Sequence, residues 1–276
     1  MKVISLINMK GGVGKTTMSV NICDCLATRN NSKVLLIDID PQFNSTQCLM
    51  NPDEYVNYLK KGSDTIINVY DRATRPLVSS VDGIKETIPK KIEDIEPLKI
   101  KKNFYLLPGN LELYRVEMTP GEGRENRLNK FLIAIKEKYN FDYVIIDTPP
   151  TPSIWMTSAL LASEYYLIPV KPDPISFTGI DLLQSIIDDR KENLDLKIKC
   201  CGVVLTMVED QTRVYKDAIK FLSTSKWSKY KYAKELPKRT AIARTQLDKT
   251  FILDLNDAQA SSAITGITDE LVRRTK

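Results

Sequence analysis

The sequence predicts an α/β protein with a mostly parallel, twisted sheet and helices on both of its faces. Short, β-like apolar runs alternate along the chain with longer stretches of helical spacing. The runs are continuously apolar, which is typical of parallel strands buried on both faces. Hydrophobic residues make up 42% of the 276 residues and charged residues 27%, an ordinary globular composition. We expect one domain over residues 1–276, without an N-terminal helix-turn-helix domain.

The expected elements follow one another in a regular order. Strands are predicted at residues 2–8, 33–38, 104–107, 143–147, 165–170 and 198–206. Helices are predicted at residues 16–29, 125–138, 153–162, 175–192 and 257–274. Residues 51–103 are charged and have few long apolar runs, so we expect short helices and loops inserted on the sheet.

Histidine is absent from the chain, which excludes His-based triads, His general bases and His metal ligands. The five cysteines form no C-x-x-C pair, so neither a zinc site nor a disulfide framework is expected. The apolar stretch at the N-terminus is too short for a signal peptide. No stretch approaches the roughly 18–20 apolar residues that span a bilayer. We therefore expect a cytoplasmic protein.

Residues 10–17, KGGVGKTT, stand directly between a predicted strand and a predicted helix. Glycines at these positions let backbone N–H groups turn inward onto a phosphate, and the helix adds its positive N-terminus. A lysine then reaches the β- and γ-phosphates, and a threonine hydroxyl binds Mg²⁺. The expected nucleotide-binding residues here are Gly11, Gly12, Val13, Gly14, Lys15, Thr16 and Thr17.

This loop departs from the common pattern G-x-x-x-x-G-K-[ST] in one place. The first glycine of that pattern falls on residue 9, which is Met9 here. A second lysine, Lys10, stands near the start of the loop. The alternative, a glycine-rich turn without a ligand, is disfavoured because the loop joins a strand to a helix.

Three carboxylates are expected at the same edge of the sheet as the loop. Asp147 ends the apolar strand 143–147, in the arrangement called Walker B, and would lie near the Mg²⁺. Asp38 and Asp40 follow the strand 33–38, and ligands of parallel sheets bind at the carboxyl ends of strands. Without histidine, a carboxylate is the available group for orienting an attacking water. The alternative for Asp38 and Asp40 is a structural role in a turn or helix cap.

These residues resemble the ParA/MinD family of deviant Walker A ATPases. KGGVGKTT matches the signature of that family, DIDPQFNST resembles its second motif and VIIDTPP its third. IPVKPDPISFTGIDLL, GVVLTMVED and ELPKRTAIA are similar to later segments of such proteins. The resemblance extends from residue 1 to about residue 272. It implies a P-loop NTPase fold, ATP and Mg²⁺ as cofactors, and a homodimer that sandwiches ATP.

The resemblance also implies roles for individual residues. Lys10 would cross the dimer interface to the partner's nucleotide and act with Lys15 and Asp40 in catalysis. Asp40 would position or activate water. The expected metal site consists of Thr16, Asp38 and Asp147. The surroundings of adenine would include Thr206, Met207 and Pro237. The implied activity is weak ATP hydrolysis stimulated by a partner.

The family contains several biological functions. ParA-like members coat nonspecific double-stranded DNA and partition plasmids or chromosomes with a ParB-type centromere-binding protein. MinD-like members bind membranes through a C-terminal amphipathic helix. Nitrogenase iron proteins need cluster cysteines, and none follows Asp147 before Cys200. A ParA-like positioning ATPase for a protein cargo is a further alternative.

The charge distribution favours DNA over a membrane. Residues 211–249 contain eleven Lys or Arg and three Asp or Glu residues. Such spacing suits phosphate contacts, although a solvated helix face is the alternative. The candidate DNA-binding residues are Lys216, Lys220, Lys226, Lys229, Lys234, Lys238, Arg239 and Arg244. Trp227, Tyr230 and Tyr232 are expected to pack under lysine stems rather than stack on bases.

The C-terminal helix is expected to pack on the sheet rather than on a membrane, because it lacks Trp and Phe and acidic residues interrupt its basic face. We therefore expect a nucleoid-associated partition ATPase without a membrane partner.

Overall fold

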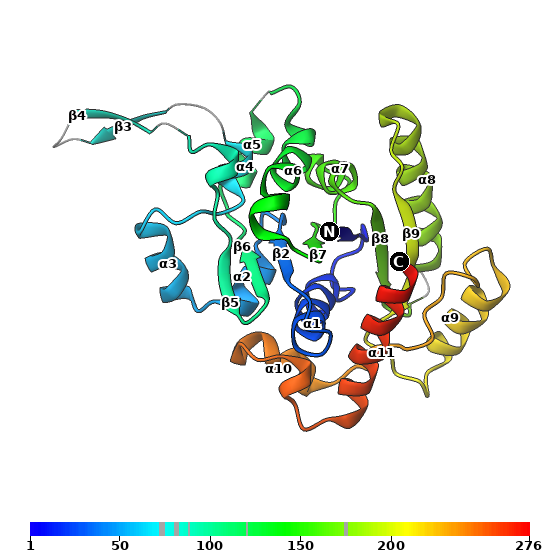
Figure 1. Cartoon of the computed structure of the whole chain (residues 1–276). Coiled ribbons are helices and arrows are strands. Elements are labelled where there is room, and N and C mark those ends of the chain that lie inside the picture. Colours follow the sequence, from blue (N-terminus) through cyan, green and yellow to red (C-terminus); the bar gives the residue numbers. More distant parts are fainter. Residues whose placement is uncertain (72–74, 80–82, 88, 120, 174–175) are drawn as a thin grey trace.

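A computed structural model describes residues 1–71, 75–79, 83–87, 89–119, 121–173 and 176–276. Its centre is a seven-stranded sheet with the strand order β5-β6-β2-β7-β1-β8-β9 (Figure 1). All neighbouring pairs are parallel except β5 and β6, which are antiparallel. The mostly parallel sheet is therefore as predicted.

The strands form where the sequence is continuously apolar. Every residue of β2 (Val34–Asp38) is buried, as are four of the five residues of β7 (Tyr143–Asp147). Parallel strands covered on both faces require this composition. The other strands of the sheet are β1 (Lys2–Leu6), β5 (Leu98–Lys101), β6 (Phe104–Leu107), β8 (Tyr165–Val170) and β9 (Lys199–Leu205).

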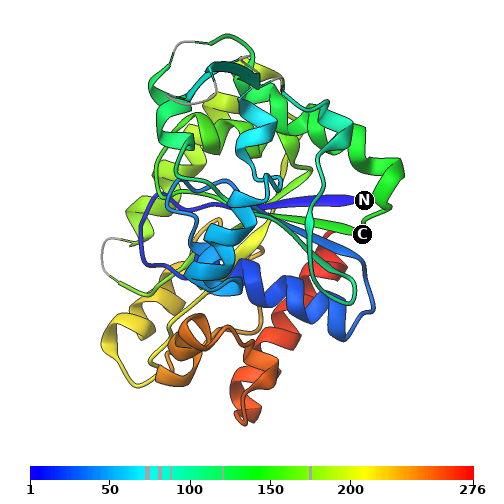
Figure 2. The same cartoon turned by 90° about the vertical axis from the view of Figure 1, so that its left-hand side faces the viewer.

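Helices cover both faces of the sheet, which Figure 2 shows between its two helical layers. One layer contains α1 (Lys15–Thr28), α2 (Asn44–Leu49), α10 (Thr240–Asp248) and α11 (Ala258–Arg274). The other contains α4 (Ile67–Tyr70), α5 (Leu113–Met118), α6 (Arg127–Tyr139) and α7 (Ile154–Ala162). The β8–β9 end packs against α8 (Ser176–Leu194) and α9 (Arg213–Thr224).

Helix α11 packs on the body of the protein, as predicted. Its apolar residues Ile264, Ile267 and Leu271 are fully buried and share a hydrophobic cluster with α1 and the sheet. The apolar stripe of this helix is therefore already covered. No helix in the described part of the chain combines the length and apolar composition that a bilayer-spanning segment requires.

The prediction for residues 51–103 is partly wrong. Short helices are present: α3 (Pro52–Lys60), α4 and the 3₁₀ turn Ile92–Asp94. The segment also contains an antiparallel hairpin of β3 (Arg75–Ser79) and β4 (Gly83–Thr87), and the edge strand β5. An edge strand needs no continuous apolar run because part of it faces solvent, so its sequence LKIK gave no strand signal.

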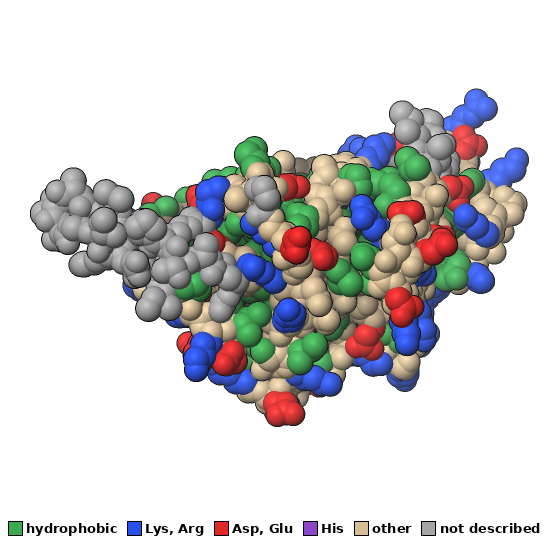
Figure 3. Space-filling view, turned by 90° about the horizontal axis from the view of Figure 1, so that it is seen from above, with side chains coloured by type: hydrophobic (Ala, Val, Ile, Leu, Met, Phe, Trp, Pro, Cys, Tyr) green, Lys and Arg blue, Asp and Glu red, His purple; other side chains and the backbone are tan. Residues whose placement is uncertain are grey.

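One face of the molecule illustrates how the surface charges are distributed. Figure 3 shows Lys and Arg side chains intermixed with Asp and Glu over this face, with apolar side chains between them. A mixed surface of this kind produces no extended field of one sign. Any electrostatic recognition on it therefore depends on local groups of residues.

Candidate functional site

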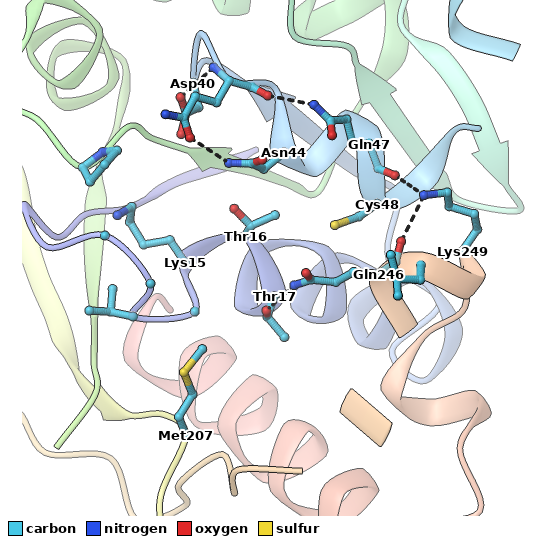
Figure 4. Close-up of a pocket in the computed structure, with 17 residues that line it drawn as sticks. Lys15, Thr16, Thr17, Asp40, Asn44, Gln47, Cys48, Met207, Gln246 and Lys249 are labelled. Atoms are coloured by element: carbon cyan, nitrogen blue, oxygen red, sulfur yellow. Dashed lines mark hydrogen bonds between the residues drawn. The ribbon is translucent and has the colours of Figure 1, made fainter. Parts of the chain in front are cut away.

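A cavity of about 470 Å³ opens at the carboxyl ends of the central strands (Figure 4). The loop between β1 and α1 forms one side of it, and the turn after β2 together with α2 and α10 forms the others. The strand order places β1 and β2 on either side of β7, so their loops meet at this edge. The lining includes all seven loop residues that were predicted to bind the nucleotide: Gly11, Gly12, Val13, Gly14, Lys15, Thr16 and Thr17.

Two glycines give the loop its shape. Gly12 and Gly14 have φ angles of +68° and +79°, in the left-handed region that favours glycine. Gly14 is the N-cap of α1, so the loop passes directly into the first turn of a 14-residue helix. Nothing lies within 4 Å of where a Cβ of Gly12 would stand. The loop therefore faces open space with the free N–H groups of a helix N-terminus, which is an anion-binding arrangement.

Lys15 is held inside the loop. Its side chain is buried, and its ammonium group donates to the carbonyl oxygens of Asn8 at 2.9 Å and Lys10 at 3.3 Å. Burial lowers the pKa of Lys15, while the nearby carboxylates of Asp147 and Asp40 oppose that shift. The fold thus fixes one cation among backbone oxygens inside the anion-binding loop.

Thr16 and Asp147 form the polar centre beneath the loop. The Thr16 hydroxyl donates to Oδ2 of Asp147 at 2.8 Å, and the Ser45 hydroxyl donates to the same oxygen at 2.8 Å. Burial raises the pKa of Asp147 to about 6, although these two hydrogen bonds lower it. Asp147 does not line the cavity itself but holds the hydroxyl of Thr16, which does.

Asp38 lies in the same buried layer but has a different partner. Its Oδ2 accepts hydrogen bonds from the backbone N–H and the hydroxyl of Thr46, both at 2.8 Å. Its Oδ1 is buried without a hydrogen-bond partner. Burial raises the pKa of Asp38 well above its usual value, and the Asp147 carboxylate adds to that shift. The structure therefore brings Asp147, but not Asp38, to the threonine hydroxyl of the predicted metal site.

Asp40 lines the cavity directly. It is 5% exposed, and its Oδ1 accepts a hydrogen bond from the backbone N–H of Gln42 at 2.9 Å. Burial raises its pKa, while this hydrogen bond and the Lys15 charge lower it. Asp40 also lines a neighbouring cavity of about 400 Å³ next to Pro149 and Trp155. Its carboxylate thus stands between the phosphate side and a second opening.

Lys10 points away from the phosphate loop of its own chain. Its ammonium group forms an ion pair with Asp173, in the segment after β8. Its backbone N–H donates to Oδ1 of Asn8 at 2.9 Å, which fixes the start of the loop. The two lysines of the loop are therefore separated, because Lys15 is buried inside and Lys10 lies at the rim.

The three predicted adenine neighbours lie together beside the phosphate loop. Thr206, Met207 and Pro237 line a cavity of about 360 Å³ that shares Gly14 and Thr17 with the first. The Thr206 hydroxyl donates to the carbonyl oxygen of Val13 at 2.7 Å, which attaches the end of β9 to the loop. The shared lining makes the two cavities one continuous site that is polar at the loop and more apolar beyond it.

Several residues that line the site were not predicted. Gln246 on α10 donates to the Thr17 hydroxyl at 2.8 Å. Lys249 donates to the carbonyl oxygens of Gln47 and Gln246, which joins α10 to α2. The motif DIDPQFNST indicates that the residues next to Asp40 lie near the site. No such pattern places α10 there, because this helix is far from the motif in the sequence. The unpredicted lining residues are Gln42, Asn44, Gln47, Cys48, Pro150, Gln246, Leu247 and Lys249.

The eight candidate DNA-binding residues are all exposed, but they do not share one cavity. Lys226 and Lys229 line a cavity between α8 and β9, whereas Lys238 and Arg239 line the cavity beside Met207. Lys238 pairs with Glu209, and Arg239 lies 3.6 Å from Asp257. The remaining exposed candidates are Lys216 and Lys220 on α9, Lys234 after α9 and Arg244 on α10.

Two of the three aromatic residues of the basic segment are buried. Trp227 is 2% exposed and Tyr232 is 1% exposed. Lys226 lies over the Trp227 ring and Lys229 over the Tyr230 ring, as predicted, whereas Tyr232 lies under Arg274 rather than under a lysine.

The chain matches one protein family and is similar to several known proteins. The family described as "AAA domain" matches residues 1–200. The sporulation initiation inhibitor protein Soj of Bacillus subtilis (strain 168) is 35% identical over 215 residues, which are 77% of this chain and 75% of that protein. The chromosome-partitioning ATPase Soj of Treponema pallidum (strain Nichols) is 27% identical over 225 residues, which are 81% of this chain and 78% of that protein.

A solved structure is similar over nearly the whole chain. It is a Borrelia burgdorferi B31 protein assigned to plasmid partition and bound to AMPPNP. The two structures share a TM-score of 0.77 and 22% identity, over 99% of this chain and 98% of that chain. This likeness confirms the predicted P-loop α/β fold.

Proposed function

Since the chain belongs to the AAA-domain family and to the ParA/MinD superfamily of ATPases, we propose that it is a Mg²⁺-dependent ATPase of DNA segregation. The observation that carries this proposal is that Lys15, Thr16, Asp40 and Asp147 lie together at one edge of the sheet. A glycine loop, a buried lysine, a threonine hydroxyl and two carboxylates at one sheet edge are the groups that phosphoryl transfer requires.

The residues present fit Mg-ATP. The described residues contain no cluster of three or more Cys, Asp or Glu side chains that could hold a metal by themselves. Mg²⁺ suits such a site because it keeps several waters and binds through few protein groups together with phosphate oxygens. Thr16 would hold the ion and Asp147 would orient the Thr16 hydroxyl. The bound ion would neutralise charge on the transferred phosphoryl group.

The loop and the residues around it would bind the rest of the nucleotide and the attacking water. The N–H groups of residues 11–14 and the Lys15 ammonium would bind the phosphates, and the cavity lined by Thr206, Met207 and Pro237 would hold adenine. Asp40 would accept a hydrogen bond from the attacking water and orient it, because its carboxylate lines the cavity. Asp38 would support this edge through Thr46.

We further propose that ATP joins two copies of the chain. Lys10 stands at the rim of the loop and cannot duplicate the position of Lys15. Released from Asp173, its ammonium would reach the nucleotide of the second copy and stabilise charge there, as an arginine finger does. Such a dimer would shield both nucleotides from bulk solvent at once.

The partition role is supported by the functions of similar proteins and by the basic segment 211–249. In this proposal the ATP dimer binds nonspecific duplex DNA through phosphate contacts and is associated with the nucleoid. A ParB-type centromere-binding protein stimulates hydrolysis and releases the dimer from DNA. The protein is proposed to act in the cytoplasm without a membrane partner.

Light scattering after size exclusion tests the nucleotide-dependent dimer. The wild-type protein in Mg-ATP should have the mass of two chains, whereas Mg-ADP should leave one. Lys10→Ala is the informative variant, because it should bind ATP but remain a monomer or hydrolyse poorly. A single mass in all nucleotide states would contradict the sandwich dimer.

A further inference from the structure

A separate cavity of about 600 Å³ lies at the opposite end of the strands from the phosphate loop. It is lined by the C-terminal half of α8, the starts of β8 and β9, and the loop after α9. Lys199 is the first residue of β9, whereas the residue after this strand, Thr206, reaches the phosphate loop. A seven-residue strand spans roughly 23 Å, so the two sites are well separated.

Four lysines from three different segments line this cavity. We call the group the lysine groove and define it as Lys191, Lys199, Lys226 and Lys229. Asp188 is the only carboxylate among the described lining residues. The cavity thus has a clear positive excess, although α8 and β9 lie outside the segment that composition marks as basic.

Two of the four charges are uncompensated. Lys226 lies 3.1 Å from Asp181, and Lys191 lies 3.9 Å from Asp188. Lys199 and Lys229 are exposed, and neither contacts a carboxylate within the described part of the chain. An anion entering the groove would therefore meet two ammonium groups without a carboxylate partner, one of which, on Lys229, lies 5.0 Å from the centre of the Tyr230 ring.

The floor of the groove shows which part of an anion it could recognise. Tyr166 and Trp227 are 0% and 2% exposed, so their rings are packed away from solvent. Their polar tips are also engaged, since Tyr166 donates to Gln184 at 2.8 Å and Trp227 donates to Asp181 at 3.0 Å. Neither of these rings can stack on a base, and the third aromatic residue of the lining, Tyr230, lies under the Lys229 ammonium. Flexible lysines suit phosphate contact rather than base recognition.

We propose that the lysine groove binds the phosphates of duplex DNA, with Lys191 and Lys199 as contacts outside the basic segment. This inference rests on the proposed DNA binding and names the surface that performs it. Lys238 is a weaker candidate because its ammonium is in direct contact with the Glu209 carboxylate, whereas Lys191 lies 3.9 Å from Asp188 and is less compensated. A dimer closed at the carboxyl ends of the strands would leave both grooves on its outer side.

A pair of double variants tests the groove. Lys191→Gln with Lys199→Gln removes two groove charges, and Lys130→Gln with Lys136→Gln removes two exposed charges from α6 as the matched control. Binding to a random duplex in Mg-ATP is measured by fluorescence anisotropy from 50 to 200 mM salt, and light scattering verifies the dimer. Each lost phosphate contact lowers the magnitude of the negative slope of log K against log salt by about 0.9. The groove variant should lose roughly two units of slope and the control none.

Lysine footprinting provides a local readout on the wild-type protein. Acetylation of each lysine is followed by mass spectrometry in Mg-ATP, with and without DNA. DNA should protect Lys199 and Lys229 and leave Lys130 and Lys136 unchanged. This readout needs no substitution, so a folding defect cannot imitate it.

The outcomes separate the inference from the proposal on which it rests. Wild-type DNA binding with an unchanged slope in the groove variant, or with Lys199 and Lys229 unprotected, would overturn the lysine groove alone. No wild-type DNA binding in any nucleotide state would overturn the proposed DNA binding, and the groove with it.

Discussion

The phosphate loop and the basic segment 211–249 place their cations in opposite ways. In the loop, Lys15 is buried, held by two backbone carbonyls and set among carboxylates. In the basic segment the candidate DNA-binding lysines are exposed, and two of them, Lys226 and Lys238, have carboxylate neighbours. A charge that must act at one atom is fixed by burial, whereas a charge that attracts a polyanion can remain mobile in solvent.

This difference predicts how each region tolerates substitution. Removing a buried, hydrogen-bonded charge costs about 2–5 kcal/mol, because it also leaves its partners unpaired. Removing one exposed lysine from a phosphate contact changes affinity by much less at moderate salt. The loop should therefore fail at a single substitution, and the basic segment should weaken gradually.

The largest effect is expected at Lys15. Lys15→Ala should abolish measurable ATP binding, because a loss of about 2–5 kcal/mol is roughly 30-fold or more in affinity. Calorimetric titration with a non-hydrolysable ATP analogue measures this. Lys10→Ala is the control and should keep the affinity of the monomer. Normal ATP affinity in Lys15→Ala would remove the phosphate-loop assignment.

A comparable effect on a different step is expected at Asp40. Asp40→Ala should keep ATP binding but lower hydrolysis by about 100-fold or more, because the water-orienting carboxylate is lost. ATP dimers should then accumulate. Phosphate release and light scattering on the same sample report both changes. Unchanged hydrolysis would move the catalytic role to another residue.

A smaller effect distinguishes two lysines within the basic segment. Lys229→Gln should lower the magnitude of the salt slope of DNA binding by about 0.9, as expected for one phosphate contact. Lys238→Gln should change the slope less, because its partner Glu209 already offsets its charge. Salt titrations of the two variants in Mg-ATP make this comparison. Equal slopes would show that ion pairing does not rank these contacts.

The smallest effect concerns a buried charge outside both regions. Asp24 on α1 pairs with Lys101, yet burial raises its pKa in the folded state. A carboxyl group with a raised folded-state pKa favours folding when protonated, and that stability is lost as pH rises above its ordinary value of 3.8. The melting temperature of Asp24→Asn should therefore increase relative to the wild type between pH 4 and pH 7. A decrease would show that the Lys101 ion pair outweighs burial.

The sequence predicted the site best where characteristic residue types stand at defined positions relative to a predicted strand or helix. The loop at 10–17 joins a strand to a helix, and Asp147 ends an apolar strand, so topology alone brings Thr16 and Asp147 together. The edge strand β5 and the hairpin of β3 and β4 gave no such signal. Their sequences lack the continuous apolar run that a doubly covered strand requires.

Long-range packing accounts for the rest of what the sequence did not predict. Gln246 and Lys249 reach the site because α10 packs beside α2, and no local pattern indicates that contact. The composition identified a basic segment, but it did not show that residues of this segment line two different cavities. It also missed Lys191 and Lys199, which join the lysine groove only through the packing of α8 and β9.

Binding to a random DNA duplex without nucleotide, with Mg-ADP and with Mg-ATP tests the central claim most directly. The claim is that ATP bound at the phosphate loop joins two chains into a dimer, and that this dimer binds DNA through its exposed basic residues. Tight binding only with Mg-ATP, weakening steeply as salt rises, is the predicted result. Equal affinity in all three states, or no binding in any of them, would contradict the claim.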